Sequence, residues 1–441
     1  MRPISIVVGL GKTGVSCVRF LVDKGFHVAA VDSRAHPPGL SEFQQTFPQV
    51  NISLGNFDID FLSQADYLVV SPGLSLREPA IAACIQRDIK IIGDIELFAQ
   101  YVQVPVVAVT GTNGKSTVIA LLGEMVRQAK LAVCVGGNIG TPVLDLLAVS
   151  APAWYVLELS SFQLDTTHSL KLKAATILNI SDDHLDRHLT LQAYHQAKQR
   201  IFLHAEQAIV NHDDKATFPP NDLPMRSFTL AVPQAGEFGI RNQNGQTYLS
   251  CGHELLLLVS EMKLKGQHNW ANALAALAMG QAMALPMPAM LMALQNFPGL
   301  DHRCQWLREV DKVNWINDSK ATNVGACVAA LYGLSKNLTG KIILIAGGQS
   351  KGADLSGLKN AVSEVVRHLI VFGEDASLLI DALQAYTSMS RASDLQQAVA
   401  LAKQNAQPGD IVLFAPACAS FDMFKNFEHR GEMFSQWVAK L

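Results

Sequence analysis

A glycine-rich loop with a lysine followed by two adjacent hydroxyl side chains occupies residues 111–117 and follows an apolar run that begins at residue 104. Gly111 and Gly114 free the backbone N–H groups of the loop to face phosphate oxygens. Lys115 can neutralise the β- and γ-phosphates of a nucleotide, and Ser116 can hold Mg²⁺. The spacing departs from the usual pattern because Val109 stands where the first glycine is expected. A plain helix start explains neither the lysine nor the adjacent hydroxyls, so the loop predicts phosphate binding.

Carboxylates and a histidine follow two further predicted strands. Glu158 lies in the segment 154–161, at the C-terminal end of a predicted strand, and a carboxylate leaving a buried strand is costly unless it binds something. Asp182, Asp183 and His184 come directly after the run 174–180. Ligands of parallel sheets bind at the carboxyl ends of the strands, and Mg²⁺ prefers oxygen. We interpret Glu158 as a Mg²⁺ ligand; a helix cap or a salt-bridge partner is the alternative. We interpret the segment 182–184 as a metal or phosphate site; a polar turn is the alternative.

A second glycine pattern, Gly9-Leu-Gly11-Lys-Thr-Gly14, follows the first predicted strand, and Asp32 ends the next one. This is the fingerprint of dinucleotide binding, in which the backbone approaches a phosphate at a helix N-terminus. Taken alone, it favours a dehydrogenase, with a tight strand–helix turn as the alternative. Lys198 lies in a helical pattern, which indicates nothing beyond a solvated lysine.

Alternation of apolar runs with helical patterns predicts an α/β fold built on parallel sheets. The 441 residues suggest about three domains, with boundaries near 93–104 and 297–301 and a small antiparallel insert at 212–262. Residues 266–300 contain no Asp, Glu, Lys or Arg, and we predict two buried helices, near 269–284 and 287–296, rather than a membrane span. The net charge of −3 lacks the excess of positive charge that is typical of nucleic-acid-binding proteins. The N-terminus has no signal-peptide layout, which favours the cytoplasm.

The chain resembles the Mur ligases, the ATP-dependent amide ligases of peptidoglycan precursor synthesis. The segments GTNGKST, NISDDHLDRH, GQHNWANALAA and NDSKATN occur in the order of that family, and the resemblance covers essentially the whole chain. It implies a UDP-substrate-binding Rossmann-like domain at 1–93, a central P-loop ATP-binding domain at 94–298, and a Rossmann-like amino-acid-binding domain at 299–441.

GDIELF, NDSKATN and PACASFDMFKNFEHRGE resemble the member that adds D-glutamate to UDP-N-acetylmuramoyl-L-alanine through an acyl phosphate. Folylpolyglutamate synthesis is the alternative within this class of ligases. A Rossmann oxidoreductase is the alternative outside it, although a hydride-transferring enzyme has no use for a triphosphate loop. We expect a monomer.

The resemblance also implies the roles of individual residues. For the UDP substrate these are Thr13, Asp32, Arg34, Gly73 and Asn138; for ATP they are Gly111, Thr112, Asn113, Gly114, Lys115, Ser116, Thr117, Asn272, Arg303 and Asp318; for D-glutamate they are Thr322, Lys351, Ser420 and Phe427. Two Mg²⁺ ions are implied, one held by Ser116 and Glu158 and the other by His184 and Lys198. Lys198 matches a family lysine that CO₂ carbamylates, which would turn an ammonium into an oxygen ligand. Lys115, His184 and Lys198 are the implied catalytic residues.

Overall fold

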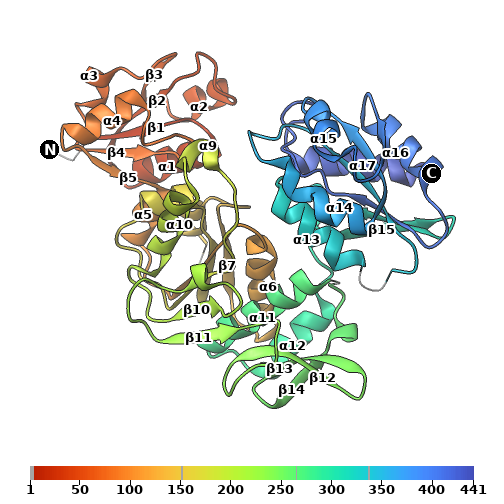
Figure 1. Cartoon of the computed structure of the whole chain (residues 1–441). Coiled ribbons are helices and arrows are strands. Elements are labelled where there is room, and N and C mark those ends of the chain that lie inside the picture. The colour runs from red at the N-terminus through yellow and green to blue at the C-terminus, as the bar shows by residue number, and fades with distance from the viewer. Residues whose placement is uncertain (1–3, 150–151, 265, 336–337) are drawn as a thin grey trace.

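The computed structural model describes residues 4–149, 152–264, 266–335 and 338–441 and shows three α/β sheets along the chain. Figure 1 places the first sheet and the third sheet apart, with the middle one below them. The first sheet is fully parallel, in the order β3-β2-β1-β4-β5. Its strands are β1 (Ile4–Val8), β2 (His27–Asp32), β3 (Asn51–Leu54), β4 (Tyr67–Val70) and β5 (Lys90–Ile92), with helices α1 (Lys12–Asp23), α2 (Leu40–Thr46), α3 (Ile59–Leu62) and α4 (Pro79–Gln86) between them.

The middle sheet has nine strands in the order β14-β13-β12-β11-β10-β9-β6-β8-β7. They are β6 (Val106–Thr110), β7 (Val133–Gly137), β8 (Trp154–Glu158), β9 (Ala174–Ile177), β10 (Ala208–Asn211), β11 (Met225–Phe228), β12 (Phe238–Gln243), β13 (Gln246–Cys251) and β14 (Glu254–Leu258). The predicted insert at 212–262 is therefore only partly antiparallel. β12, β13 and β14 form antiparallel pairs, but β11 pairs parallel to β10 and continues the same sheet.

Two alanine-rich helices, α11 (Gln267–Ala282) and α12 (Met287–Asn296), match the predicted pair closely. Both pack on α6 (Lys115–Gln128), the helix that follows the glycine loop and buries most of its side chains. In the described part of the chain, no helix has the length and hydropathy needed to span a membrane. The other helices between the strands of the middle sheet are α7 (Val143–Leu146), α8 (Ser161–Asp165), α9 (Leu185–His188), α10 (Leu191–Gln199) and the 3₁₀ turns η1 (Arg200–Phe202), η2 (Lys215–Thr217) and η3 (Val259–Glu261).

The third sheet has six strands in the order β15-β16-β20-β17-β18-β19, and only β15 runs antiparallel to its neighbour. The strands are β15 (Gln305–Val310), β16 (Val313–Asn317), β17 (Ile342–Gly347), β18 (Val366–Phe372), β19 (Ser388–Arg391) and β20 (Ile411–Phe414). Helices on its two faces bury two separate apolar cores. These helices are α13 (Val324–Ser335), α14 (Lys359–Val365), α15 (Ala376–Leu383), α16 (Leu395–Asn405) and α17 (Phe427–Ala439), with a 3₁₀ turn η4 at Leu355–Leu358.

The first and middle sheets share one apolar core through α5 (Asp94–Ala99). Phe98 packs edge-to-face on Tyr155 with ring centroids 5.2 Å apart. Two buried carboxylates tie the same helix to the middle sheet. Asp94 Oδ2 accepts a hydrogen bond from Gln163 Nε2 at 2.9 Å, and Glu96 accepts the backbone N–H groups of residues 168 and 169. The GDIELF segment thus positions the first sheet against the second.

We expect Asp94→Asn to stabilise the protein at neutral pH but not in acid. Burial raises the pKa of Asp94 from its ordinary value of 3.8 to about 6, and its Oδ1 atom has no hydrogen-bond partner among the described residues. Because the folded state holds the proton more tightly, the carboxyl destabilises the fold as pH rises from about 4 to about 6, by up to about 3 kcal/mol. The melting temperatures of the wild-type protein and the Asp94→Asn variant, measured at pH 4.5 and pH 7.5, test this. If the two proteins differ in melting temperature by the same amount at both pH values, the expectation is contradicted.

Candidate active site

The glycine loop closes around its own lysine. Gly111 and Gly114 have φ angles of 143° and 85°, which only glycine adopts readily, and a Cβ at Gly114 would collide with the side chain of Asn272. Lys115 Nζ donates to the carbonyl oxygens of Gly111 and Thr112, both at 2.8 Å. Burial lowers the pKa of Lys115, while Glu158 and Asp183 oppose that change. Among the residues that the structure describes, no carboxylate bonds directly to this cation.

A hydroxyl and a carboxylate meet at the N-terminus of α6. Ser116 Oγ donates to Glu158 Oε2 at 2.6 Å, and Asn138 Nδ2 donates to the other oxygen, Oε1, at 2.8 Å. Arg303, from the chain that enters the third sheet, reaches across and donates from Nη2 to Ser116 Oγ at 2.6 Å. Oxygen donors of this kind suit Mg²⁺. Ser116, Glu158 and Arg303 thus lie together, and Asn138 contacts Glu158.

Lys198 is buried, so the prediction of a solvated lysine is wrong. Only 2% of the residue is exposed, because α10 lies against the end of β6. Its Nζ donates to Gly111 O at 2.9 Å and Thr110 Oγ1 at 3.3 Å, and lies 4.6 Å from the Tyr194 ring centroid. Burial holds the pKa of Lys198 well below its ordinary value, and nearby Lys115 lowers it further.

His184 and Asp183 begin α9 beside this lysine. The His184 backbone is left-handed, with φ 55°, and its ring packs edge-to-face on Phe162 at 5.0 Å. Burial lowers the pKa of His184, which favours the neutral imidazole. Asp183 Oδ2 accepts a hydrogen bond at 3.1 Å from Asn323 Nδ2 of the third sheet.

One cavity of about 420 Å³, here named the inter-sheet cavity, joins these groups to the C-terminal loops. Burial lowers the pKa of Lys320 to about 8, and its Nζ lies 3.8 Å from the Phe427 ring centroid. The predicted residues that line this cavity are Thr112, Asn113, Gly114, Lys115, Ser116, Asn138, Glu158, His184, Lys198, Arg303, Thr322, Lys351, Ser420 and Phe427.

A second cavity of about 380 Å³ lies next to it and is lined by amides. Asn272 Nδ2 donates to Asn269 Oδ1 at 3.2 Å, which orients the pair. Asp318 accepts the Cys304 N–H at 3.1 Å, and burial raises the pKa of its carboxyl to about 6. Asn272, Asp318, Thr117 and Arg303 all line this cavity. A planar base and a ribose fit amides beside a carboxylate.

The residues of the first sheet that are predicted to bind the UDP substrate do not all line one cavity. A third cavity of about 410 Å³ is lined by Arg34, Lys12 and Arg19, but Thr13, Asp32 and Gly73 do not line it. Asp32 is 2% exposed; its oxygens accept from Leu10 N at 2.7 Å and from the Arg34 guanidinium at 2.7 and 2.8 Å. Burial opposes ionisation, but these hydrogen bonds lower the pKa of Asp32 to about 2. Asp32 therefore positions Arg34 and the glycine turn.

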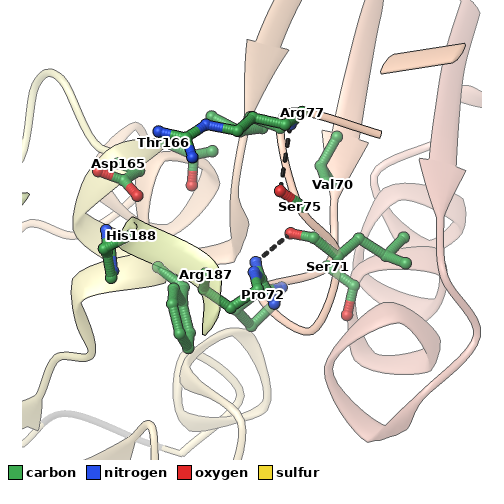
Figure 2. A pocket seen from close by; sticks show the side chains of 12 residues that line it. Val70, Ser71, Pro72, Ser75, Arg77, Asp165, Thr166, Arg187 and His188 are labelled. Carbon is green, nitrogen blue, oxygen red and sulfur yellow. Dashed lines mark hydrogen bonds between the residues drawn. The ribbon is translucent and has the colours of Figure 1, made fainter. Parts of the chain in front are cut away.

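Figure 2 shows how Arg187 of α9 reaches the turn after β4. Its guanidinium donates to Gly73 O at 2.9 Å and to Leu74 O at 2.7 Å, and lies over the Phe162 ring at 4.3 Å. Gly73 is thus held from the segment that carries His184. A small cavity of about 80 Å³ opens beside this contact.

Family models match all three parts of the chain. They are a "Mur ligase MurD-like, N-terminal domain" over residues 4–93, a "Mur ligase middle domain" over 109–280, and a "Mur ligase, glutamate ligase domain" over 302–418. The chain belongs to the Mur ligase family. The resemblance noted in the sequence is therefore confirmed.

Curated relatives of this Mur ligase cover nearly its full length. A "UDP-N-acetylmuramoylalanine--D-glutamate ligase" of Pseudomonas syringae pv. syringae is 52% identical over 98% of this chain and 97% of its own. The protein of that name from Legionella pneumophila is 49% identical over 99% of both chains.

Solved structures share the fold of this Mur ligase at low identity. A pseudomurein peptide ligase type C from Methanothermus fervidus has a TM-score of 0.64 with 19% identity, over 100% of both chains. A MurF ligase from Thermotoga maritima in complex with ADP has a TM-score of 0.62 with 16% identity, over 100% of this chain and 96% of that one.

Sequence reasoning missed several residues of the site. Tyr194, Asn323 and Arg187 bond to or pack on predicted residues, but each does so across at least 80 positions of the chain or through a ring face. Among the described residues, no group of three or more His, Cys, Asp or Glu side chains could hold a metal. The predicted metal sites are of another kind, because their ligands include a serine and a lysine.

We expect Asp32→Asn to weaken binding of a UDP-linked substrate by about 10-fold, because Arg34 loses a charged hydrogen-bond partner at a half-exposed site. The affinity for ATP should stay the same. Asp66→Asn is the matched control, since Asp66 also accepts a backbone N–H in the first sheet, at 2.6 Å from Ile4 N. Titration calorimetry with each ligand measures both affinities. An equal loss in the Asp66 variant would contradict a specific role for Asp32.

Proposed function

We propose that this Mur ligase joins D-glutamate to UDP-N-acetylmuramoyl-L-alanine with cleavage of ATP. One observation carries the proposal: a single cavity brings the glycine loop of the middle sheet, with Lys115 and Ser116, to the C-terminal residues Thr322, Lys351 and Ser420. A phosphate site and an amino-acid site in one cavity suit a reaction that passes through an acyl phosphate. The names of relatives about 50% identical over nearly the whole chain support the substrates.

The first step must bring two anions together. A carboxylate oxygen of the UDP substrate attacks the γ-phosphorus of ATP, the bond to the β-phosphate oxygen breaks, and ADP leaves. At about 4 Å, two unit charges repel by about 4 kcal/mol at a partly desolvated site. Lys115, Arg303 and Lys320 all line the inter-sheet cavity and supply the positive charge that offsets this repulsion.

In the second step, the amine of D-glutamate attacks the acyl carbon. The tetrahedral intermediate collapses, the C–O bond to phosphate breaks, and the amine loses a proton. Two carboxylates of D-glutamate must stay anchored while the amine reaches the carbonyl. We assign one to Lys351 and Thr322 and the other to Ser420 and the backbone near Phe427.

The residues present fit two Mg²⁺ ions, which would neutralise phosphate charge when bound. Ser116 and Glu158 would hold one, and Asn138 orients that carboxylate. His184 and Lys198 would hold the other, provided that Lys198 is a carbamate. Burial lowers the pKa of the Lys198 amine and so favours its neutral form, whose lone pair can attack CO₂ while one proton leaves to solvent.

We further infer which domain of the chain binds each substrate. The parallel sheet of residues 1–93 serves as a Rossmann-like domain for the UDP substrate. Residues 94–298 form the P-loop domain for ATP, with Asn272 at the adenine and Asp318 from the next domain at the ribose. Residues 299–441 form the Rossmann-like domain for D-glutamate. We also infer that the reaction takes place in the cytoplasm and that the protein acts as a monomer.

The test of the function is release of inorganic phosphate. We expect release only when ATP, Mg²⁺, UDP-N-acetylmuramoyl-L-alanine and D-glutamate are all present. L-glutamate should not replace D-glutamate, because inverting the α-carbon turns the amine away while both carboxylates stay anchored. Activity with a folate and L-glutamate would support the folylpolyglutamate alternative, and tight binding of NADH would support the oxidoreductase.

We expect Lys351→Ala to raise the KM for D-glutamate by about 10- to 100-fold, because it removes a charge-assisted hydrogen bond to a carboxylate. The KM values for ATP and the UDP substrate should change far less, since the other domains bind those ligands. Steady-state kinetics with each substrate varied in turn give the three values. Equal increases in all three would show that Lys351 is not part of the amino-acid site.

A further inference from the structure

Arg430 is a buried cation without a bound anion. The residue is 0% exposed, and in the described part of the chain no carboxylate oxygen lies within ion-pairing distance of it. It also sits in the first turn of α17, where the helix dipole disfavours positive charge. Burial lowers the pKa of Arg430 to about 10, so the side chain stays protonated at neutral pH. Burying such a charge is costly unless many hydrogen bonds offset the desolvation.

The acceptors of Arg430 come from three separate loops. Nε and Nη2 donate to Ser319 Oγ at 3.1 Å and Ser319 O at 2.8 Å. Nη1 is shared between Gly347 O at 3.4 Å, Cys418 O at 3.0 Å and Ala419 O at 3.1 Å. Ser319 Oγ in turn donates to Phe427 O at 2.9 Å. One planar guanidinium therefore fixes the backbone of all three loops relative to α17.

The same three loops carry the residues assigned to D-glutamate. Thr322 stands three positions after Ser319, Lys351 four positions after Gly347, and Ser420 directly after Ala419. The loops at 347–351 and 417–420 also pair directly, through Gln349 N to Ala419 O at 3.0 Å and Ala419 N to Gln349 O at 2.8 Å. Arg430 does not line the inter-sheet cavity itself.

We propose that Arg430 is a positioning residue that sets the distance between the two carboxylate-binding halves of the amino-acid site. This inference rests on the function proposed above. The guanidinium suits the role because its five N–H donors lie in one rigid plane, whereas a lysine ammonium is a single flexible point. The spacing of the two carboxylates is what distinguishes D-glutamate from its shorter and longer homologues.

The experiment compares Arg430→Lys with the wild-type enzyme on D-glutamate, D-aspartate and D-2-aminoadipate. We expect the D-glutamate KM to rise by about 10- to 100-fold, with the KM for ATP nearly unchanged, because small misplacements of binding groups have effects of this size. The preference for D-glutamate over D-aspartate and D-2-aminoadipate, measured as ratios of kcat/KM, should also fall. Arg308→Lys is the control, since Arg308 donates to Ala439 O in the same domain but contacts none of the three loops.

A merely structural role gives a different result. If Arg430 only stabilises the fold, the variant will lose kcat through loss of active enzyme, while the D-glutamate KM and both selectivity ratios stay constant; that result would overturn the proposal. Should Arg430→Lys fail to fold, Ser319→Ala removes one acceptor of the same network and should lower the selectivity in the same direction. Wild-type enzyme without any D-glutamate activity would instead refute the proposed function.

Discussion

Lys198→Met is expected to reduce turnover by at least about 100-fold, the scale on which loss of one preorganised charge-stabilising group acts. Methionine fills the space of the lysine but cannot form a carbamate. Lys198→Glu should recover part of the activity, because a carboxylate supplies the oxygen ligand directly. Wild-type activity should fall when CO₂ is stripped from the buffer and return with bicarbonate. Phosphate release in the presence of all three substrates measures each value.

The fold of the Lys198 variants needs its own measurement. Because the amine is buried and donates to Gly111 O and Thr110 Oγ1, its removal deletes two hydrogen bonds and costs about 1–3 kcal/mol, although both oxygens keep a second partner. Lys171→Met, at an exposed lysine before β9, is the matched control. Enzyme equilibrated with ¹³C-labelled CO₂ should show a carbamate resonance that the Lys198 variant lacks. A fully active wild-type enzyme without that resonance would contradict carbamylation.

Lys115→Ala is expected to reduce the rate of phosphoryl transfer by about 100- to 1,000-fold. Lys115 lies partly buried in the glycine loop, where its Nζ donates to two backbone carbonyls, so its charge is available to a phosphate. The affinity for the UDP substrate should stay the same, because no residue of the glycine loop lines the third cavity, which lies in the N-terminal part of the chain. Single-turnover formation of ADP from ATP and the UDP substrate, without D-glutamate, isolates this step.

Lys130→Gln provides the control for Lys115, since Lys130 is an exposed lysine just beyond the other end of α6. It should leave the rate unchanged. Near-normal ADP formation by the Lys115 variant would refute the assignment of residues 111–117 to the nucleotide phosphates. A parallel loss of affinity for the UDP substrate would show instead that the substitution disturbs the fold.

The features that the sequence predicted best are those determined within one short segment of the chain. The phosphate loop was recognisable because a strand, glycines, a lysine and a hydroxyl succeed one another within a few residues, and Ser116 of this loop donates to Glu158. The helices at 267–282 and 287–296 were recognisable because a stretch without charges has to be buried. In both cases the sequence carries the physical cause within one segment.

Features that depend on distant partners were not predictable in the same way. Lys198 reads as a surface residue because nothing in its helix shows that β6, about 88 positions away, covers it. The β11 strand reads as part of an insert because only its pairing with β10 joins it to the main sheet. The role of Arg430 was not predictable either, since all but one of its partners are backbone carbonyls, which every residue possesses.

The glycine loop and the amino-acid loops are anchored by different means, which bears on how the protein tolerates mutation. The loop at 111–117 ends in α6, whose apolar residues pack on β6 and β8 and on the helices α11 and α12. Many side chains share that anchoring, so volume-conserving changes at one position can be absorbed by the others. The three C-terminal loops converge on one guanidinium, for which no neighbour can substitute. In a saturation-mutagenesis library, the core of α6 should therefore accept several apolar residues at each position, whereas position 430 should accept arginine alone.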